Sequence, residues 1–70
     1  MNRKPNINLK IASIKAGISF FQISRETGIH HSRISQIANA WVTPNETEKD
    51  KIAQVLNVEV NDIFPETSVD

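Results

Sequence analysis

The stretch FFQISRETGIHHSRISQI, residues 20–37, contains the pattern that decides the fold. Counted from Phe20, its fifth residue is the small Ser24, its ninth is Gly28, and its fourth, tenth, fifteenth and eighteenth are isoleucines. Apolar residues at these intervals lie on one face of each of two short helices, and glycine permits the left-handed backbone of a tight turn. The stretch therefore predicts two helices that cross at the small residue and share a buried face, which is the helix-turn-helix arrangement.

The segment before this stretch also has a helical period. Isoleucines at positions 7, 11, 14 and 18 form one apolar stripe, and Leu9, Ala12 and Ala16 form a second stripe beside it. Gly17 is expected to end this first helix. Ser19 and Gln22 have the spacing of a capping box, which predicts that the second helix starts there and runs to about Thr27.

The segment after it predicts two further helices. Thr43 is the expected cap of the fourth helix, with Pro44 at its first position and Glu46 closing the box. This helix reaches Leu56, with Ile52, Ala53 and Leu56 inward, and Asn57 ends it. A last turn spans roughly residues 60–64. We expect residues 1–70 to form one compact all-α domain of five short helices, with a core of about 7–64 and short disordered tails.

Composition limits the classes of protein and the compartment. The net charge is zero, but residues 1–41 sum to +5 and residues 42–70 to −5, which suggests a basic binding face and an acidic remainder. Without cysteine there is no disulfide or thiolate metal site, and a reducing cytoplasm fits. No apolar run approaches the roughly 20 residues of a membrane span, and no signal peptide is visible. The sequence contains no nucleophile–base constellation that would predict an enzyme, and we expect no cofactor or small-molecule ligand.

Three segments together resemble a known family: LKIASIKAGIS (9–19), QISRETGIHHSRISQIANAW (22–41) and TPNETEKDKIAQVLNVEVNDIF (43–64). They are similar to the phage repressor/Cro-like helix-turn-helix domains, the XRE-type bacterial regulators. The resemblance implies a five-helix lambda-repressor-like fold whose recognition helix, about residues 30–39, enters the major groove of double-stranded DNA. It also implies a sequence-specific transcription regulator, often a homodimer on an inverted repeat, in the cytoplasm with the nucleoid.

The third helix can be oriented from its own core. With Ile34 and Ile37 inward, a step of about 100° per residue turns Ser32, Gln36 and Asn39 outward, with Ser35 at the flank. Gln36 can pair with adenine, and His31 in the first turn can donate to guanine. By the resemblance, the base-reading positions are His31, Ser32 and Gln36, and the expected backbone contacts are Arg33, Asn39, Ser35 and Lys10. Bases of the N-terminal arm, Arg3 and Lys4, could add to these. The alternative for each polar side chain is ordinary solvation.

The adjacent histidines could suggest a metal site. Neighbouring helical residues diverge, however, and no carboxylate or cysteine has ligand spacing nearby, so we expect no metal. His30 is predicted to lie in the cap region of the third helix.

The sequence departs from the family pattern at several positions. Ser13 and Ala38 replace a common buried Arg–Glu pair, which predicts that they lie close together. Phe20 replaces a common Gln that contacts phosphate. Phe20 and Phe21 cannot both face the core, so one is expected to be exposed, either as a dimer or partner surface or partly buried against the N-terminal segment. Trp41 is expected to cap the core between the third and fourth helices, and the acidic loop after it predicts modest non-specific affinity.

Two questions stay open at this point. The resemblance places a dimer interface at Val60, Ile63 and Phe64, but these residues could instead close the core of the monomer. The exposed phenylalanine, Trp41 and the acidic second half also allow an alternative function. The chain could be a protein-interaction module, antitoxin-like or partner-binding, that keeps the fold with weak or no specific DNA reading.

Overall fold

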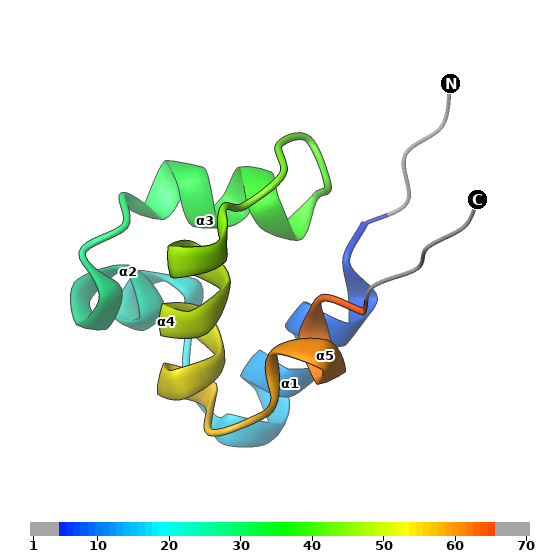
Figure 1. Cartoon of the computed structure of the whole chain (residues 1–70). Coiled ribbons are helices and arrows are strands. Elements are labelled where there is room, and N and C mark those ends of the chain that lie inside the picture. Colours follow the sequence, from blue (N-terminus) through cyan, green and yellow to red (C-terminus); the bar gives the residue numbers. More distant parts are fainter. Residues whose placement is uncertain (1–4, 66–70) are drawn as a thin grey trace.

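The computed structural model describes residues 5–65, which form five helices and contain no strand. Figure 1 shows α3 along one end of the molecule, α4 running away from it, and α1 and α5 side by side. The all-α, five-helix prediction is therefore confirmed. The helices are α1 (Ile7–Ala16), α2 (Phe20–Thr27), α3 (His31–Ala38), α4 (Glu46–Leu56) and α5 (Val60–Ile63).

Left-handed residues end four of the helices. Gly17, Gly28 and Asn57 have φ values of 68°, 79° and 59° and follow α1, α2 and α4, as the sequence predicted. The fourth case was not predicted: Ala40, with φ 61°, follows α3. There the Ala40 N–H donates to Ile37 O and the next N–H, of Trp41, donates to Gln36 O. This pair of bonds is the Schellman motif, in which glycine is the usual left-handed residue.

The predicted starts of α2 and α4 have different outcomes. Ser19 caps α2 by accepting a 3.1 Å hydrogen bond from the Gln22 N–H, as predicted. The predicted start of α4 is wrong, because its cap is Asn45 rather than Thr43. Asn45 Oδ1 accepts from the Glu48 N–H at 2.8 Å, and Glu48 Oε1 accepts from the Asn45 N–H at 2.9 Å. Asparagine is at least as good a cap as threonine. Asn45 and Glu48 are three residues apart, as Thr43 and Glu46 are, so both pairs have the spacing of a capping box.

The core joins all five helices around the isoleucines of the opening pattern. Ile23, Ile34 and Ile37 are buried, and Ile29 packs half-buried against them. The other buried apolar residues are Leu9, Ala38, Ile52, Ala53, Leu56 and Ile63. Ser13 is buried too, and its hydroxyl donates to the Ile18 carbonyl, so it needs no ionic partner. Both Ser13 and Ala38 are thus buried on contacting helices, and their direct proximity stays a prediction.

The prediction for Trp41 is wrong, and the residues of the expected dimer interface pack in or against the core. Trp41 is 67% exposed and does not cap the core. The chain turns at Ala40, and the next residue, Val42, packs against the core instead. Ile63 is only 1% exposed and belongs to the monomer core. Val60 and Phe64 pack half-buried against that core, which fits the alternative that this turn closes the monomer, and the dimer interface there stays a prediction.

One of the two apolar stripes of α1 faces solvent. Leu9 and Ser13 are buried, whereas Ile7, Ile11 and Ile14 are 56%, 44% and 78% exposed. At about 100° per residue, the three isoleucines lie within one narrow sector opposite the buried side. The helix therefore presents an outward apolar stripe, Ile7, Ile11 and Ile14, that the domain itself does not cover.

Candidate nucleic-acid interface

Thr27 fixes the turn between α2 and α3. Its buried hydroxyl donates to Ile23 O at 2.7 Å and accepts from the Ile29 N–H at 3.1 Å. The Gly28 N–H donates to Ser24 O at 2.8 Å, which closes the end of α2. The hydroxyl thus joins the last turn of α2 to the residue that leads into α3. The sequence pattern did not single out Thr27; a threonine directly before the turn glycine was the available signal.

The outward face of α3 is polar and uncovered. Ser32 and Gln36 are exposed, as predicted, and Ile34 and Ile37 on the opposite side are buried. Ser35 and Asn39 lie half-buried at the flank and the end of the helix. Asn39 Nδ2 donates to Ser35 O at 3.0 Å, so one side of its amide already caps the helix. The exposed Ser32 and Gln36 therefore present polar side chains to solvent on the outward face of α3.

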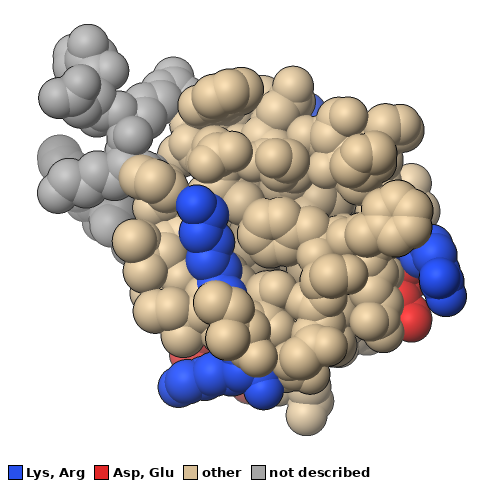
Figure 2. Space-filling model, turned by 180° about the vertical axis from the view of Figure 1, so that it is seen from behind, with Lys and Arg blue, Asp and Glu red and all other residues tan. Residues whose placement is uncertain are grey.

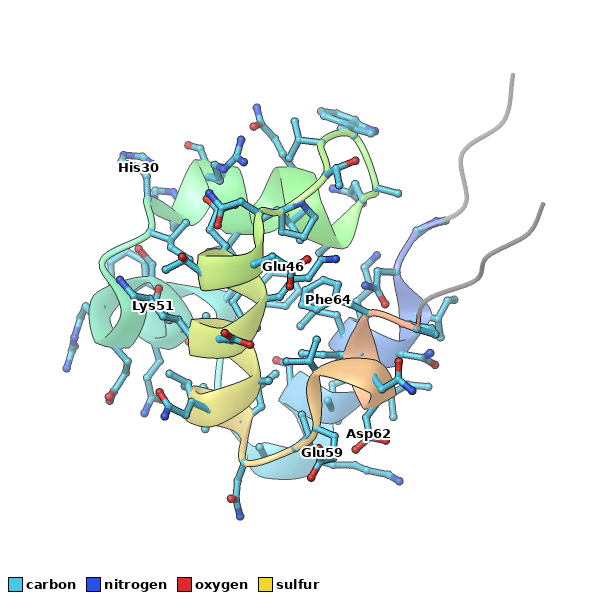
Figure 3. The ribbon with its side chains drawn as sticks, viewed as in Figure 1. His30, Glu46, Lys51, Glu59, Asp62 and Phe64 are labelled. Atoms are coloured by element: carbon cyan, nitrogen blue, oxygen red, sulfur yellow. The ribbon has the colours of Figure 1, made fainter. Side chains whose placement is uncertain are left out.

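Aromatic rings surround the start of α3. His30 caps the helix, as predicted, because its Nδ1 accepts from the Ser32 N–H at 3.1 Å. Its ring stacks on that of His31, with centroids 5.0 Å apart. Phe21 also packs edge-on against His31, with ring centroids 5.6 Å apart. The His31 ring therefore contacts two other rings while remaining exposed, and Figure 3 shows His30 at the outer end of α3.

The phenylalanine pair divides as predicted, with one ring outside. Phe21 is 61% exposed, whereas Phe20 is half-buried against the core. Among residues 5–65, no cluster of three His, Cys, Asp or Glu side chains could hold a metal ion. The exposed Phe21 ring contacts the His31 ring.

Arg33 points from the side of α3 to α4. Its Nε and a terminal nitrogen donate to the two carboxylate oxygens of Glu48, at 2.8 and 3.0 Å. The hydrogen bond from Arg33 lowers the pKa of Glu48, and the same bond raises the pKa of Arg33. The sequence predicted the sideways direction of Arg33 but not this partner, and its phosphate contact stays untested.

The comparison with known families agrees with this geometry. The sequence profile described as winged helix-turn-helix DNA-binding matches residues 8–67. The chain belongs to this family. No curated protein and no solved structure matches the chain at a significant level.

This winged helix-turn-helix chain has no wing in the part that the structure describes, because residues 5–65 contain no strand. The membership makes the chain a DNA-binding domain. In the fold, α2, the turn at Gly28 and α3 form its helix-turn-helix. No helix among the described residues is long and apolar enough to cross a membrane.

Charged side chains of the winged helix-turn-helix domain are unevenly placed. The face seen in Figure 2 is mostly uncharged, with lysine and arginine side chains scattered across it and near its edges. Lys10 is half-buried beside a hollow of about 340 Å³ that Ser13, Ile14 and Phe20 also line. Arg3 and Lys4, the expected contacts of the N-terminal arm, lie outside the described residues.

Proposed function

We propose that this domain is a sequence-specific transcription regulator whose helix α3 enters the major groove of DNA. The observation that carries the proposal is that α3 has one buried apolar face and one exposed polar face. Its inner isoleucines are fully buried while its outer face, with Ser32 and Gln36 exposed, is polar and uncovered. A helix anchored in this way fits the major groove, which is wide enough to admit it.

The chemistry of the outer face suits base recognition. The Gln36 amide carries a donor and an acceptor that match adenine N6 and N7, and the His31 ring can donate to guanine N7 or O6. The flanking rings restrict His31, so less conformational freedom is lost on binding. Ser32 is the third proposed base-reading residue, and Ser35, Asn39 and Lys10 are the proposed phosphate contacts. Five helices without a strand in residues 5–65 support the phage repressor/Cro-like, XRE-type branch of helix-turn-helix regulators.

Selection of bound duplexes from random DNA tests this proposal. We expect a short inverted repeat to emerge, and its binding to weaken as salt rises. The variant Gln36→Ala should lose about 1–3 kcal/mol of discrimination at one base position, because a bidentate base contact contributes that much. Gln54→Ala, at an exposed position on α4, is the matched control and should bind as wild type. If wild type and Gln36→Ala both bind DNA weakly, equally and without sequence preference, the proposal is wrong.

We further propose that two copies meet through the outward stripe of α1. The expected interface around Ile63 is buried in the monomer, and Ile7, Ile11 and Ile14 are an exposed apolar surface of α1. In Figure 1 the outer side of α3 and the helix α1 lie toward different ends of the domain. Pairing through α1 therefore leaves both recognition helices uncovered, as an inverted repeat requires.

The oligomeric state of two variants tests this interface. Ile14→Glu places a charge in the stripe and should make the protein monomeric in analytical ultracentrifugation. Asn8→Glu adds the same charge at an exposed position of α1 outside the stripe and should leave the dimer intact. A wild-type protein that stays monomeric on its operator would contradict the dimer.

A second function has one observation in its favour. Phe21 and Trp41 are both more than half exposed, as they would be on a surface for a partner protein. An antitoxin-like or partner-binding module would show no shift of duplex DNA even at low salt. That outcome would favour this function over DNA reading.

A further inference from the structure

The contact between Arg33 and Glu48 is a fork-to-fork ion pair between α3 and the first turn of α4. Two parallel hydrogen bonds of 2.8 and 3.0 Å join the guanidinium to the two carboxylate oxygens. The Glu48 side chain is only 14% exposed and that of Arg33 is 38% exposed. Another ion pair, Lys49–Glu46, lies within α4, spans 3.9 Å and has a Glu46 side chain 89% exposed. Bidentate geometry and partial burial make the first pair much the stronger of the two.

Glu48 has a second partner that fixes its position. Its Oε1 also accepts from the Asn45 N–H at 2.9 Å, while Asn45 Oδ1 accepts from the Glu48 N–H. The carboxylate is thus part of the capping box of α4 and cannot follow Arg33 if the guanidinium moves away. The pair therefore ties the recognition helix to a rigid helix end.

Breaking the Arg33–Glu48 ion pair would be unfavourable at the DNA surface. If Arg33 turned to a phosphate, Glu48 would remain a partly buried carboxylate without its cation. The hydrogen bond that lowers the pKa of Glu48 in the pair would be lost, and the negative charge of the carboxylate would then oppose that of the DNA backbone nearby. Held together, the two side chains have no net charge beside the recognition helix.

We propose that Arg33 and Glu48 stay paired on DNA, and that Glu48 is a positioning residue that sets the orientation of α3 through Arg33. The inference rests on the proposed function. It replaces the expectation of a phosphate contact at Arg33 with a brace that holds the helix carrying Gln36. Arg33 then contributes nothing to the salt dependence of binding.

Salt titrations of four proteins on one selected operator test the brace: wild type, Arg33→Gln, Glu48→Gln and the double variant. Each phosphate contact adds about 0.9 to the slope of log affinity against log salt. For a brace, Arg33→Gln alone leaves an unpaired carboxylate and should weaken binding by roughly tenfold. The double variant can form an amide–amide contact without charge, and it should recover to within about threefold of wild type with an unchanged slope.

The other results would overturn the proposal. A double variant as weak as Arg33→Gln, with a slope smaller by about 0.9, would show that Arg33 contacts a phosphate. If the variants lose helical structure, the Arg33 Nε–H resonance of wild type decides instead. It should show the same protection from exchange in the free protein and on the operator, and loss of protection on DNA contradicts the brace. A wild-type protein that binds no duplex would instead remove the proposed function, and this role with it.

Discussion

Asn6 connects three helices, and its replacement should destabilise the domain more than a typical surface change. Asn6 Oδ1 caps α1 by accepting from the Leu9 N–H at 2.9 Å. Its Nδ2 donates to the Ile63 carbonyl at 2.7 Å, and its own N–H donates to the Ala38 carbonyl at 2.7 Å. The side chain thus joins α1 to the end of α5, and the backbone joins α1 to the end of α3.

The expected loss can be worked from these bonds. Removing the cap costs about 1 kcal/mol, and leaving the carbonyl of the buried residue Ile63 without its donor costs about 1 kcal/mol more. The backbone bond to Ala38 survives a side-chain change. Asn6→Ala should therefore lower the free energy of unfolding by about 2 kcal/mol, or the melting temperature by about 8–16 °C for a domain of this size.

Thermal and urea unfolding followed by circular dichroism measure this loss, and Asn6→Asp separates the two bonds. An aspartate keeps the acceptor for the Leu9 N–H and favours the positive end of the helix, but at neutral pH it cannot donate to the Ile63 carbonyl. It should therefore lose roughly half as much stability as Asn6→Ala. Two results would refute the reasoning: an alanine variant within about 0.5 kcal/mol of wild type, or an aspartate variant as unstable as alanine.

Four further predictions concern single residues. Ala40→Gly should stabilise the domain by about 1 kcal/mol and raise its melting temperature by about 4–8 °C, because it relieves a left-handed alanine. Gly17→Ala should do the reverse, since the added Cβ meets no atom within 4 Å and only the backbone is strained. Thr27→Val should lose about 1–3 kcal/mol in urea unfolding, because the Ile29 N–H loses its acceptor, while Thr27→Ser should lose less. Because the pKa of Glu48 is lowered in the folded state, its stabilising effect exists above the unfolded pKa and disappears as pH falls through the folded value. The stability gap between wild type and Glu48→Gln should therefore shrink from pH 7 toward pH 3, and a constant gap would contradict this.

The helix-turn-helix was predictable because its constraints are local. Gly28 is left-handed, Ile23, Ile34 and Ile37 are buried, and Ser19 caps α2, each as the spacing indicated. Such features follow from residues within one or two turns of each other. The pattern therefore also predicted which side of α3 is outward, and Ser32 and Gln36 are exposed.

The sequence alone could not predict the structure where two local patterns were both possible. Residues 43–48 contain two possible capping boxes, and the second one, from Asn45 to Glu48, begins α4. In α1 two apolar stripes were available, and Leu9 rather than the isoleucines faces the core. Only packing between helices makes that choice. The Arg33–Glu48 pair also joins residues 15 apart in the chain, beyond the range of any local pattern.

The arrangement of acidic residues explains how a domain of zero net charge can still bind DNA. Seven of the eight acidic residues lie in residues 42–70, and the first half of the sequence is basic. In the structure, Glu48 is paired with Arg33, and Asp62 accepts from the Glu59 N–H at the start of α5. Figure 3 shows Glu59 and Asp62 at the end of the domain away from His30 and α3. Glu48 therefore adds no unpaired negative charge beside the recognition helix, and Glu59 and Asp62 lie away from it. Little positive charge is concentrated there either, so non-specific attraction should be modest. If the proposed function holds, we expect affinity to come mainly from the proposed base contacts of α3 and from the proposed second copy.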